Sequence, residues 1–356
     1  MPTKSSIGNA PEGTETTADP LESTYTLRRL TPEYAREIPA LAMRVNGPSY
    51  IHAEVYHPER LLDLNASGEL VSVVALDKAG EVVGHCALER PHLTVVAETG
   101  EAMVLPEHRR HHLLDRMHGY LEGIASTLGV LGLSSDAVTH HVFSQRTCER
   151  FNSHPTGIVL GALPPGADNL AGVYPQRLSF LDYFKYVSPP PEADVFLPEH
   201  YRGIAGSIFE RLGRRASFGA PVRPTKPGKH TVAYVSDEQR ANIAVREPGA
   251  DTADAIAGAR DELCAKSAAE VVIAELPLAH SASPAVCDQL ECRGFFFTGL
   301  KMRDPAVGDI ARLQYLKQPL DFSLIKLGGE FAIELLRQID DARRRAIANS
   351  GSRPIT

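Results

Sequence analysis

The stretch from Ala97 to Ile124, AETGEAMVLPEHRRHHLLDRMHGYLEGI, decides the fold of this 356-residue chain. Its first part is predicted to be a strand that ends near Val104 and Pro106, and its last part has apolar residues at helical spacing. Between these parts, Glu107 to Arg110 are expected to form a short crossing and the first helical turn. A helix that begins at a strand end offers free backbone N–H groups and a partial positive charge, and both suit a phosphate.

Within this stretch, Val104-x-Pro106-x-x-Arg109 leading into a helix resembles the acetyl-CoA signature of the GNAT acetyltransferase superfamily. In that family the pattern usually continues as Arg/Gln-x-x-Gly-x-Gly/Ala, whereas this chain has RRHHLL at 109–114. His112 and Leu114 fill the two glycine positions. This departure concerns phosphate binding directly, because glycine lets a backbone approach a pyrophosphate closely.

The order of the predicted elements extends the resemblance over residues 25–164. Helices are expected near 31–42 and 57–64, in the second part of the 97–124 stretch and along 143–151. Strands are expected at 25–30, 70–76, 82–88, 98–104, 131–135 and 157–163. This order is similar to that of a GNAT fold. It implies an α/β (α+β) protein with a mixed, mostly antiparallel central sheet flanked by helices.

The second half of the chain repeats this layout. Arg293-Gly294-Phe295-Phe296-Phe297 resembles the Gly-Phe segment that commonly follows the last helix of a GNAT unit. The motif Val-x-Pro-x-x-Arg does not precede the helix here, and VREPG stands at 245–249 in its place. The negative charge of Glu247 would repel a phosphate. The resemblance therefore implies two tandem halves, the second a degenerate GNAT-like unit that binds no CoA.

Breaks in the pattern set the expected domain boundaries. The N-terminal residues are rich in Thr, Ser, Gly, Pro and Glu and offer little to bury, which is typical of disorder. The expected parts are a disordered tail at 1–24, an acetyltransferase domain at 25–165, a connecting segment with a strand and a helix at 166–230, a degenerate GNAT-like domain at 231–346, and a flexible C-terminus at 347–356.

Composition excludes several classes of protein. The net charge of −7 lacks the basic excess that nucleic-acid binding usually needs, so no nucleic-acid partner is expected. No apolar run approaches the roughly 20 residues of a membrane span, and no secretory signal is recognisable, so no membrane partner is expected. Five cysteines without a C-x-x-C pair indicate reduced thiols and a cytoplasmic setting. A homodimer is left open.

The resemblance implies acetyl-CoA as a co-substrate and assigns residues to it. Strand-like pairing is expected along Ala102, Met103 and Val104, and the following turn is expected to hold the pyrophosphate through Arg109, Arg110, His111, His112, Leu113 and Leu114. Ser144 and Gln145 are expected to contact the pantetheine arm, or Ser144 only caps a helix. The alternative for the turn is an ordinary crossover with surface arginines.

Glu98 and Glu101 are the candidate general bases. An amine acceptor is protonated at neutral pH, and a carboxylate whose pKa is raised by burial can take its proton. The two residues are an odd number of positions apart, so a regular strand points their side chains to opposite faces of the sheet. One of them is therefore expected to be merely solvated. The resemblance favours Glu98, since a glutamate on this strand often has that role in GNAT enzymes.

The acceptor amine, a small molecule or a peptide, is expected to enter between the loops at 50–56 and 140–143, with Tyr50, His52 and Tyr56 bordering the cleft. The tyrosine that serves many GNAT enzymes as general acid is missing between 143 and 157, and His140 is a substitute proton donor, together with His141 and His154.

No metal site is expected. Of four histidines on the long helix, only His108 and His112 have i, i+4 spacing, and no Cys, Asp or Glu completes a ligand set. The predicted function is acetyl-CoA-dependent N-acetylation of an unidentified amine by direct attack on the thioester. Two alternatives are a catalytically degenerate sensor or scaffold and another acyl-CoA reaction, such as decarboxylation, that uses Thr139 and His140.

Overall fold

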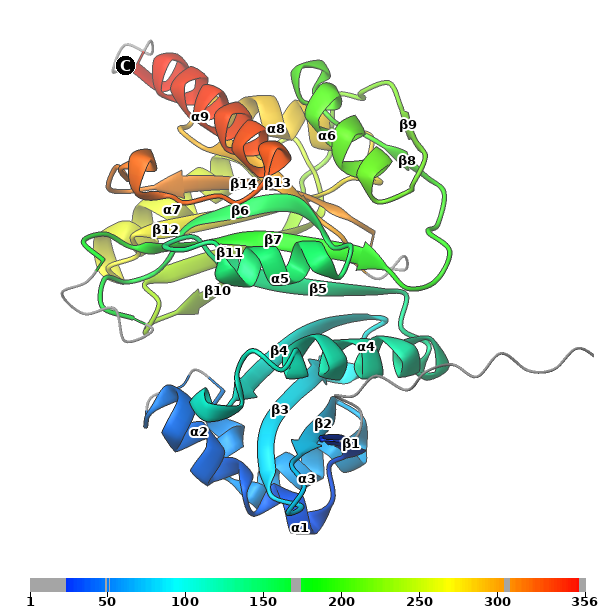
Figure 1. Ribbon diagram of the computed structural model, residues 1–356. Coiled ribbons are helices and arrows are strands. Elements are labelled where there is room, and N and C mark those ends of the chain that lie inside the picture. Colours follow the sequence, from blue (N-terminus) through cyan, green and yellow to red (C-terminus); the bar gives the residue numbers. More distant parts are fainter. Residues whose placement is uncertain (1–23, 49, 51, 168–173, 304–307, 352–356) are drawn as a thin grey trace, which may run out of the picture.

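A computed structural model describes residues 24–48, 50, 52–167, 174–303 and 308–351, so the expected disordered tail lies almost wholly outside the described residues. Twelve strands form one sheet in the order β1-β2-β3-β4-β5-β7-β6-β13-β14-β12-β11-β10, with helices packed against it (Figure 1). Only the β4–β5 and β11–β12 pairs of this described sheet are parallel. The predicted mixed, mostly antiparallel sheet flanked by helices is therefore confirmed.

The first part of the sheet follows the predicted order of elements. Its bounds are β1 (Thr26–Arg29), α1 (Pro32–Ala35), α2 (Ile38–Asn46), α3 (Pro58–Ser67), β2 (Leu70–Leu76), β3 (Val82–Glu89), β4 (Val96–Val104), α4 (Leu113–Ala125), β5 (Gly132–Val138), α5 (Phe143–Arg150), β6 (His154–Leu163) and β7 (Leu178–Tyr186). Strands β2 and β3 are buried almost throughout, as their continuous apolar runs predict.

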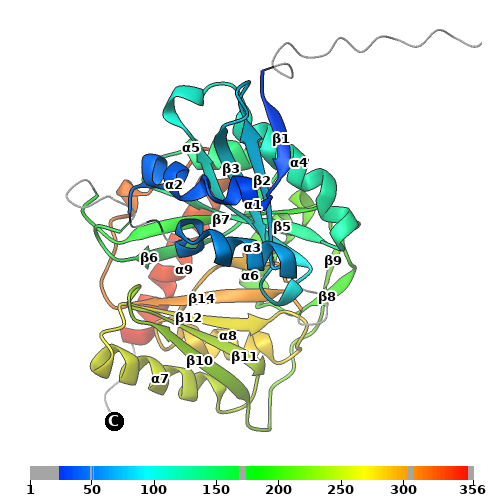
Figure 2. The same ribbon diagram turned by 90° about the horizontal axis from the view of Figure 1, so that it is seen from below.

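Helices α1 to α3 cover one face of β1–β4, and α4 covers the other (Figure 2). A Cβ atom on Gly84 of β3 would contact the side chain of Met117 in α4, and Leu113 and Leu121 of α4 are buried in the same core. The helix begins at Leu113, so the prediction that Arg109 and Arg110 occupy its first turn is wrong. The helix cannot begin earlier, because Arg110 has φ +68°, which is incompatible with a right-handed α-helix.

The second part of the chain continues the same sheet, and its hydrophobic core is shared with β5, β6 and β7 of the first part through residues such as Ala137, Ile158 and Tyr183. Its elements are β8 (Ala193–Val195), α6 (Glu199–Arg211), β9 (Ala216–Phe218), β10 (Lys229–Val235), β11 (Arg240–Glu247), α7 (Thr252–Lys266), β12 (Val271–Pro277), α8 (Ser283–Glu291), β13 (Phe296–Lys301), β14 (Ile310–Leu316) and α9 (Glu330–Gly351). None of the described helices combines the length and the apolar character that a bilayer crossing requires.

The strand order of the second part repeats that of the first. β10-β11-β12-β14-β13 corresponds to β3-β4-β5-β7-β6, and the parallel pair β11–β12 has the place of β4–β5. This correspondence supports the expectation of two related halves, which stays a prediction.

Two expected boundaries are wrong. β7 lies between β5 and β6, so the first unit extends to Tyr186 and a boundary at 165 would separate a strand from both of its neighbours. α9 continues to Gly351, so 347–351 are helical and do not belong to a flexible end, while 352–356 lie outside the described residues.

A glycine seam, formed by Gly157 of β6 and Gly299 of β13, joins the two halves. The two residues face each other in the antiparallel pair. Gly299 has φ +131°, a conformation that only glycine adopts readily, and a Cβ atom placed on it would clash with the Cα of Gly157. The continuous sheet therefore requires close backbone contact at this point.

Substitution Gly299→Ala is expected to lower the free energy of unfolding by about 2–4 kcal/mol, because it adds backbone strain and a steric clash at the glycine seam. Urea denaturation followed by circular dichroism measures the change. The matched control is Gly258→Ala in α7, where a Cβ atom meets no neighbour and where alanine favours the helix by about 0.5–1 kcal/mol. Equal stabilities of the two variants would contradict the importance of the seam.

Candidate functional site

β4 and β5 begin as a parallel pair and then separate (Figure 1). Their paired residues run from Val96–Gly132 to Glu98–Ser134, although β4 continues to Val104 and β5 to Val138. Over the described remainder of both strands no further ladder pairs form between them. The edge of β4 beyond Glu98 therefore offers backbone hydrogen-bonding groups to an extended ligand.

A cavity of about 410 Å³ lies where this edge meets the N-terminus of α4. Most of the residues of β4 and of the following turn that were predicted to hold the cofactor line this cavity. They are Ala102, Met103, Val104, Arg109, Arg110, His112, Leu113 and Leu114. His111 does not line it, and its ring instead packs against that of Tyr25 with centroids 5.5 Å apart. Val45, His108, Asp115 and Arg150 complete the lining.

The two bulky residues at the expected glycine positions leave the cavity open. His112 has φ +54°, the left-handed conformation that glycine would adopt, and its imidazole is 70% exposed and lies 3.0 Å from a carboxylate oxygen of Asp115. Leu114 lines the wall of the cavity. Among the described residues no side chain caps the N-terminus of α4, so its first N–H groups remain available to an anion.

Asp115 places a negative charge in the first turn of α4, on the lining of the same cavity. Its carboxylate forms an ion pair with Arg150 at 2.9 Å, and the hydrogen bonds and charges of His112 and Arg150 lower its pKa although partial burial opposes this. The pairing reduces the repulsion that Asp115 exerts on a phosphate.

A β-bulge at Glu101 reorganises the side chains of β4. The register shifts between His85 and Ala87 of β3, and Glu101 has φ +50°. Because of the extra residue, Glu98 and Glu101 both lie on the side of the sheet where His52 lies. The expectation that they point to opposite faces is therefore wrong.

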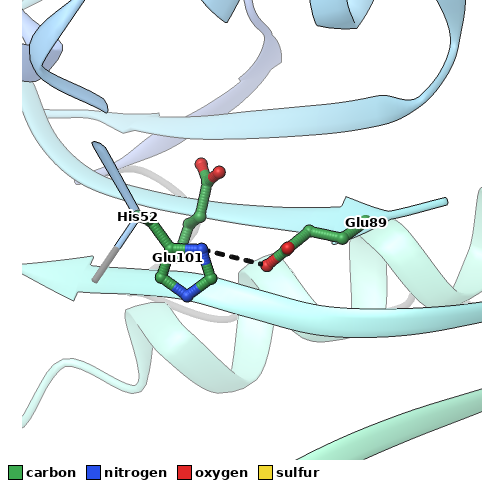
Figure 3. A group of neighbouring side chains, drawn as sticks. All are labelled: His52, Glu89 and Glu101. Atoms are coloured by element: carbon green, nitrogen blue, oxygen red, sulfur yellow. Dashed lines mark ion pairs between the residues drawn. The ribbon is translucent and has the colours of Figure 1, made fainter. Parts of the chain in front are cut away.

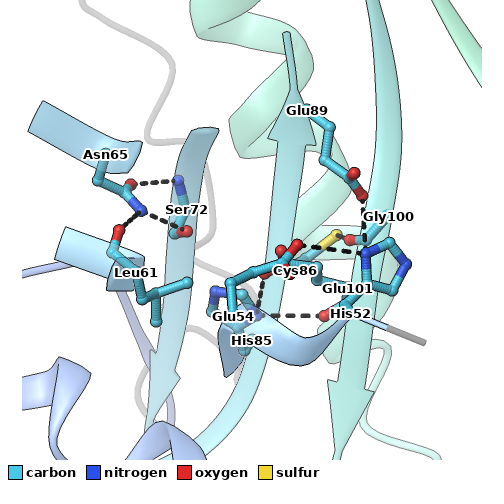
Figure 4. A network of polar contacts seen from close by, with 10 residues as sticks. All are labelled: His52, Glu54, Leu61, Asn65, Ser72, His85, Cys86, Glu89, Gly100 and Glu101. Carbon is cyan, nitrogen blue, oxygen red and sulfur yellow. Dashed lines mark hydrogen bonds and ion pairs between the residues drawn. The ribbon is translucent and has the colours of Figure 1, made fainter. Parts of the chain in front are cut away.

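The bulge gathers an acidic cluster around His52, which lies in the connection between α2 and α3. Its Nδ1 atom is 3.4 Å from Oε1 of Glu89 (Figure 3) and 3.6 Å from Oε1 of Glu54 (Figure 4). Glu101 is 1% exposed and points into the same group (Figure 4). Glu98, directly opposite Glu89 in the β3–β4 ladder, is exposed at the edge of the cluster.

The environment separates the pKa values of these carboxyl groups. Burial, together with the charges of Glu89 and Glu54, raises the pKa of Glu101 to about 9. Burial raises the pKa of Glu89 to about 7, and the hydrogen bond from His52 lowers that of Glu54 to about 2. Loss of hydration raises the pKa of Glu98, while the positive charges of Lys301 and His52 oppose the increase.

The structure does not bring His140 to this cluster. Its described ring contacts are with His141, at 4.2 Å between centroids, and with Tyr174, at 6.1 Å. Its buried Nδ1 atom has no hydrogen-bond partner among the described residues, and burial lowers its pKa. A role as proton donor stays a prediction.

Gln145 is buried in the protein, and the prediction that it contacts a pantetheine arm is wrong. Its Nε2 atom donates to the carbonyl oxygens of Val138, His141 and Lys326 at 3.0, 3.0 and 2.8 Å, and its Oε1 atom accepts from the N–H of Gly328 at 2.9 Å. It therefore fixes α5 to the segment that precedes α9.

Ser144, next to Gln145, has a buried Oγ atom without a hydrogen-bond partner among the described residues. A hydroxyl group in this state can still donate to a ligand, so its assignment to the pantetheine arm remains a prediction.

Neither a protein-family model nor a curated protein matches this chain. Solved structures similar to it include the spermidine/spermine N-acetyltransferase from Vibrio cholerae, with 15% identity over 46% of this chain and 95% of that chain and a TM-score of 0.38. The ribosomal-protein-S18-alanine N-acetyltransferase from Escherichia coli is 12% identical in sequence, and its match covers 47% of this chain and 96% of that chain with a TM-score of 0.38.

An aminoglycoside 6'-N-acetyltransferase complexed with coenzyme A has 15% identity, covers 47% of this chain and 99% of that chain, and has a TM-score of 0.36. Another similar structure is that of an acetyltransferase of the GNAT family from Desulfovibrio desulfuricans. It is 14% identical, and the match covers 46% of this chain and 99% of that chain with a TM-score of 0.38. More than half of the chain lies outside each of these matches. We therefore base the functional proposal on the geometry of the chain itself.

Substitution Gln145→Ala is expected to lower the free energy of unfolding by at least about 2 kcal/mol, because the carbonyl of Lys326 and the N–H of Gly328 lose their buried partner. Arg146→Ala, on the exposed side of α5, is the control and should change it by less than about 0.5 kcal/mol. Unchanged stability of the Gln145 variant with a loss of CoA affinity would restore the original assignment.

Proposed function

We propose that this chain is an acyl-CoA-dependent N-acyltransferase, which uses acetyl-CoA and acts on an amine of a small molecule or a peptide. The observation that carries the proposal is the unpaired edge of β4, which leads from the cavity at α4 to the carboxylate of Glu98. At about 3.3 Å per residue, this edge spans roughly 20 Å between Glu98 and Val104. The five free cysteines of the chain favour a reducing, cytoplasmic setting for the protein.

The cofactor would lie along this edge in an extended conformation. The pyrophosphate binds at the N-terminus of α4, where Arg109 and Arg110 add positive charge to the helix dipole. The amide groups of the pantetheine arm pair with the backbone of 102–104. The thioester then reaches the bulge at Glu101, where β4 has separated from β5.

Transfer then needs one proton acceptor. The neutral amine attacks the thioester carbonyl carbon, a C–N bond forms and the C–S bond breaks, and the second proton that the nitrogen loses goes to the departing thiolate, so that CoA leaves as the free thiol. Glu98 takes the proton of the ammonium group, because it is accessible and its raised pKa strengthens it as a base. Glu101 is unsuitable, since its pKa of about 9 keeps it protonated at neutral pH and the protein buries it.

The second half contributes to the acceptor side of this site. The positive charge of Lys301 on β13 acts on Glu98, and a buried ion pair between Asp182 of β7 and Arg312 of β14 lies beyond it. Asp136 of β5, whose pKa burial raises well above its usual range, belongs to the same group of charges. The acceptor amine would therefore bind where the two halves meet.

One observation favours a second function, that of a sensor which binds CoA without turnover. Asp115 is acidic at the helix terminus that would hold the pyrophosphate, and His112 and Leu114 replace glycine there. A protein of this kind binds the ligand but releases no free thiol when amines are supplied.

The first test is calorimetric titration of the full chain with CoA and with acetyl-CoA. Arg110→Glu is expected to weaken binding roughly 5- to 30-fold, because a reversed charge at the cavity opposes the phosphates. Arg60→Glu, on the exposed face of α3, is the matched control. Absence of binding by the unaltered chain at millimolar CoA, or equal affinities of the two variants, would overturn the cofactor assignment.

The second test concerns the base. With a panel of primary amines and release of the CoA thiol as the measured quantity, Glu98→Gln is expected to lower kcat about 10²- to 10³-fold. The dissociation constant for CoA should stay unchanged, because Glu98 does not line the cavity. Glu81→Gln, in the exposed β2–β3 turn, is the control. A kcat of the Glu98 variant equal to that of the unaltered chain would assign the proton transfer elsewhere.

A further inference from the structure

Three potential metal ligands converge from separate segments of the first half. His52 lies before the 3₁₀-helix Ala53–Tyr56, Glu89 ends β3, and Glu101 forms the bulge of β4. Each offers one ligand atom, and these atoms all lie within 4.8 Å of one another (Figure 3). Small side-chain rotations would bring them to the roughly 2.0–2.2 Å bonds of a zinc ion.

A second observation points to a ligand at this place. Both carboxyl oxygens of Glu101 are buried and lack a hydrogen-bond partner among the described residues, and so does Oε1 of Glu89. The carboxyl group of Glu101 lies beside His85 and Glu54 (Figure 4). Buried polar atoms are nearly always satisfied by a partner, so these oxygens call for an explanation.

Of the nearby groups, the carboxylate of Glu54 can accept one hydrogen bond from protonated Glu101, which leaves the other oxygen of Glu101 and Oε1 of Glu89 without a partner among the described residues. Nδ1 of His85 donates to the backbone carbonyl of Glu101 at 3.2 Å and lies 3.7 Å from its carboxyl group. Burial lowers the pKa of His85 to about 4, so it carries no charge to balance Glu101. Gly100 keeps the space beside Glu89 free, because a Cβ atom there would clash with Oε1 of Glu89.

We propose that His52, Glu89 and Glu101 bind a divalent transition-metal ion of the zinc type. One imidazole nitrogen with carboxylate oxygens suits zinc better than magnesium or calcium, which prefer oxygen ligands alone. The carboxylates of Glu89 and Glu101 balance the charge of the ion when His52 is neutral, and the ionised Glu54 beside them leaves the site with one negative charge.

The site is distinct from the proposed acyl transfer. None of the three ligands lines the CoA cavity, and none is the proposed base. A bound ion would fasten the connection between α2 and α3 to the ends of β3 and β4, beside Glu98. Binding of the ion can therefore be tested whether or not the chain turns over an amine.

Calorimetric titration of the full chain with ZnCl₂ after treatment with a chelator tests the proposal. We expect one ion per chain with micromolar or tighter affinity, and a visible absorption spectrum of a low-coordinate site when CoCl₂ is added instead. Binding should also release protons, measured in two buffers of different ionisation enthalpy. The titratable groups that face the ion are His52, Glu54, His85, Glu89, Glu98 and Glu101.

Variants locate the ion. Glu101→Gln and His52→Gln are each expected to weaken Zn²⁺ binding more than tenfold, whereas His92→Gln, at an exposed histidine, should bind as the unaltered chain does. The metal-free Glu101 variant should melt no earlier than the metal-free parent, because Glu101 is protonated there and glutamine replaces one neutral group by another of similar shape. The proposal is overturned by an absence of saturable binding up to 1 mM, or by unchanged affinity in both variants. A loss of binding in His200→Gln alone would place the ion at the second group, His200, Asp288 and Glu291, and would overturn it too.

Discussion

The separation of β4 from β5 after Glu98 is the constraint on which the rest of the site depends. A ladder that continued along both strands would use the backbone groups of β4 and would close the path from the helix terminus to the acidic cluster. The crossover through α4 places a helix N-terminus beside one end of this edge, and the bulge at Glu101 places carboxyl groups beside the other. The proposed sites of phosphate binding and proton transfer would thereby lie along one strand.

Local patterns were enough to predict most elements of the fold. The apolar runs of β2 and β3 and the helical spacing of α4 are properties of neighbouring residues, and the structure has them where the sequence indicates. The position of β7 could not be predicted in the same way, because a Pro- and Gly-containing break at 164–166 precedes it and its partners are distant in sequence. The start of α4 was predicted too early in the sequence, because the residue type of Arg110 does not reveal that its φ angle is positive.

The candidate site shows the same division. All lining residues of the cavity except Val45 and Arg150 lie between 102 and 115, so one motif could identify nearly all of them. The group of His52, Glu89 and Glu101 comes from three segments, and only a bulge turns Glu101 toward the others, so no spacing rule could find it. Gln145 was assigned wrongly because the partners that hold it, near Lys326, lie 181 residues away in sequence.

The glycine seam also determines how the chain can be divided. β6 is buried along nearly its whole length, and β13 covers the edge that it would otherwise present. A fragment ending after β7 would leave an apolar strand with unsatisfied amide and carbonyl groups open to other molecules, and such edges promote intermolecular pairing and aggregation. The second half, whatever ligands it contacts, thus serves the first as a permanent edge cover, and the two are inseparable as folding units.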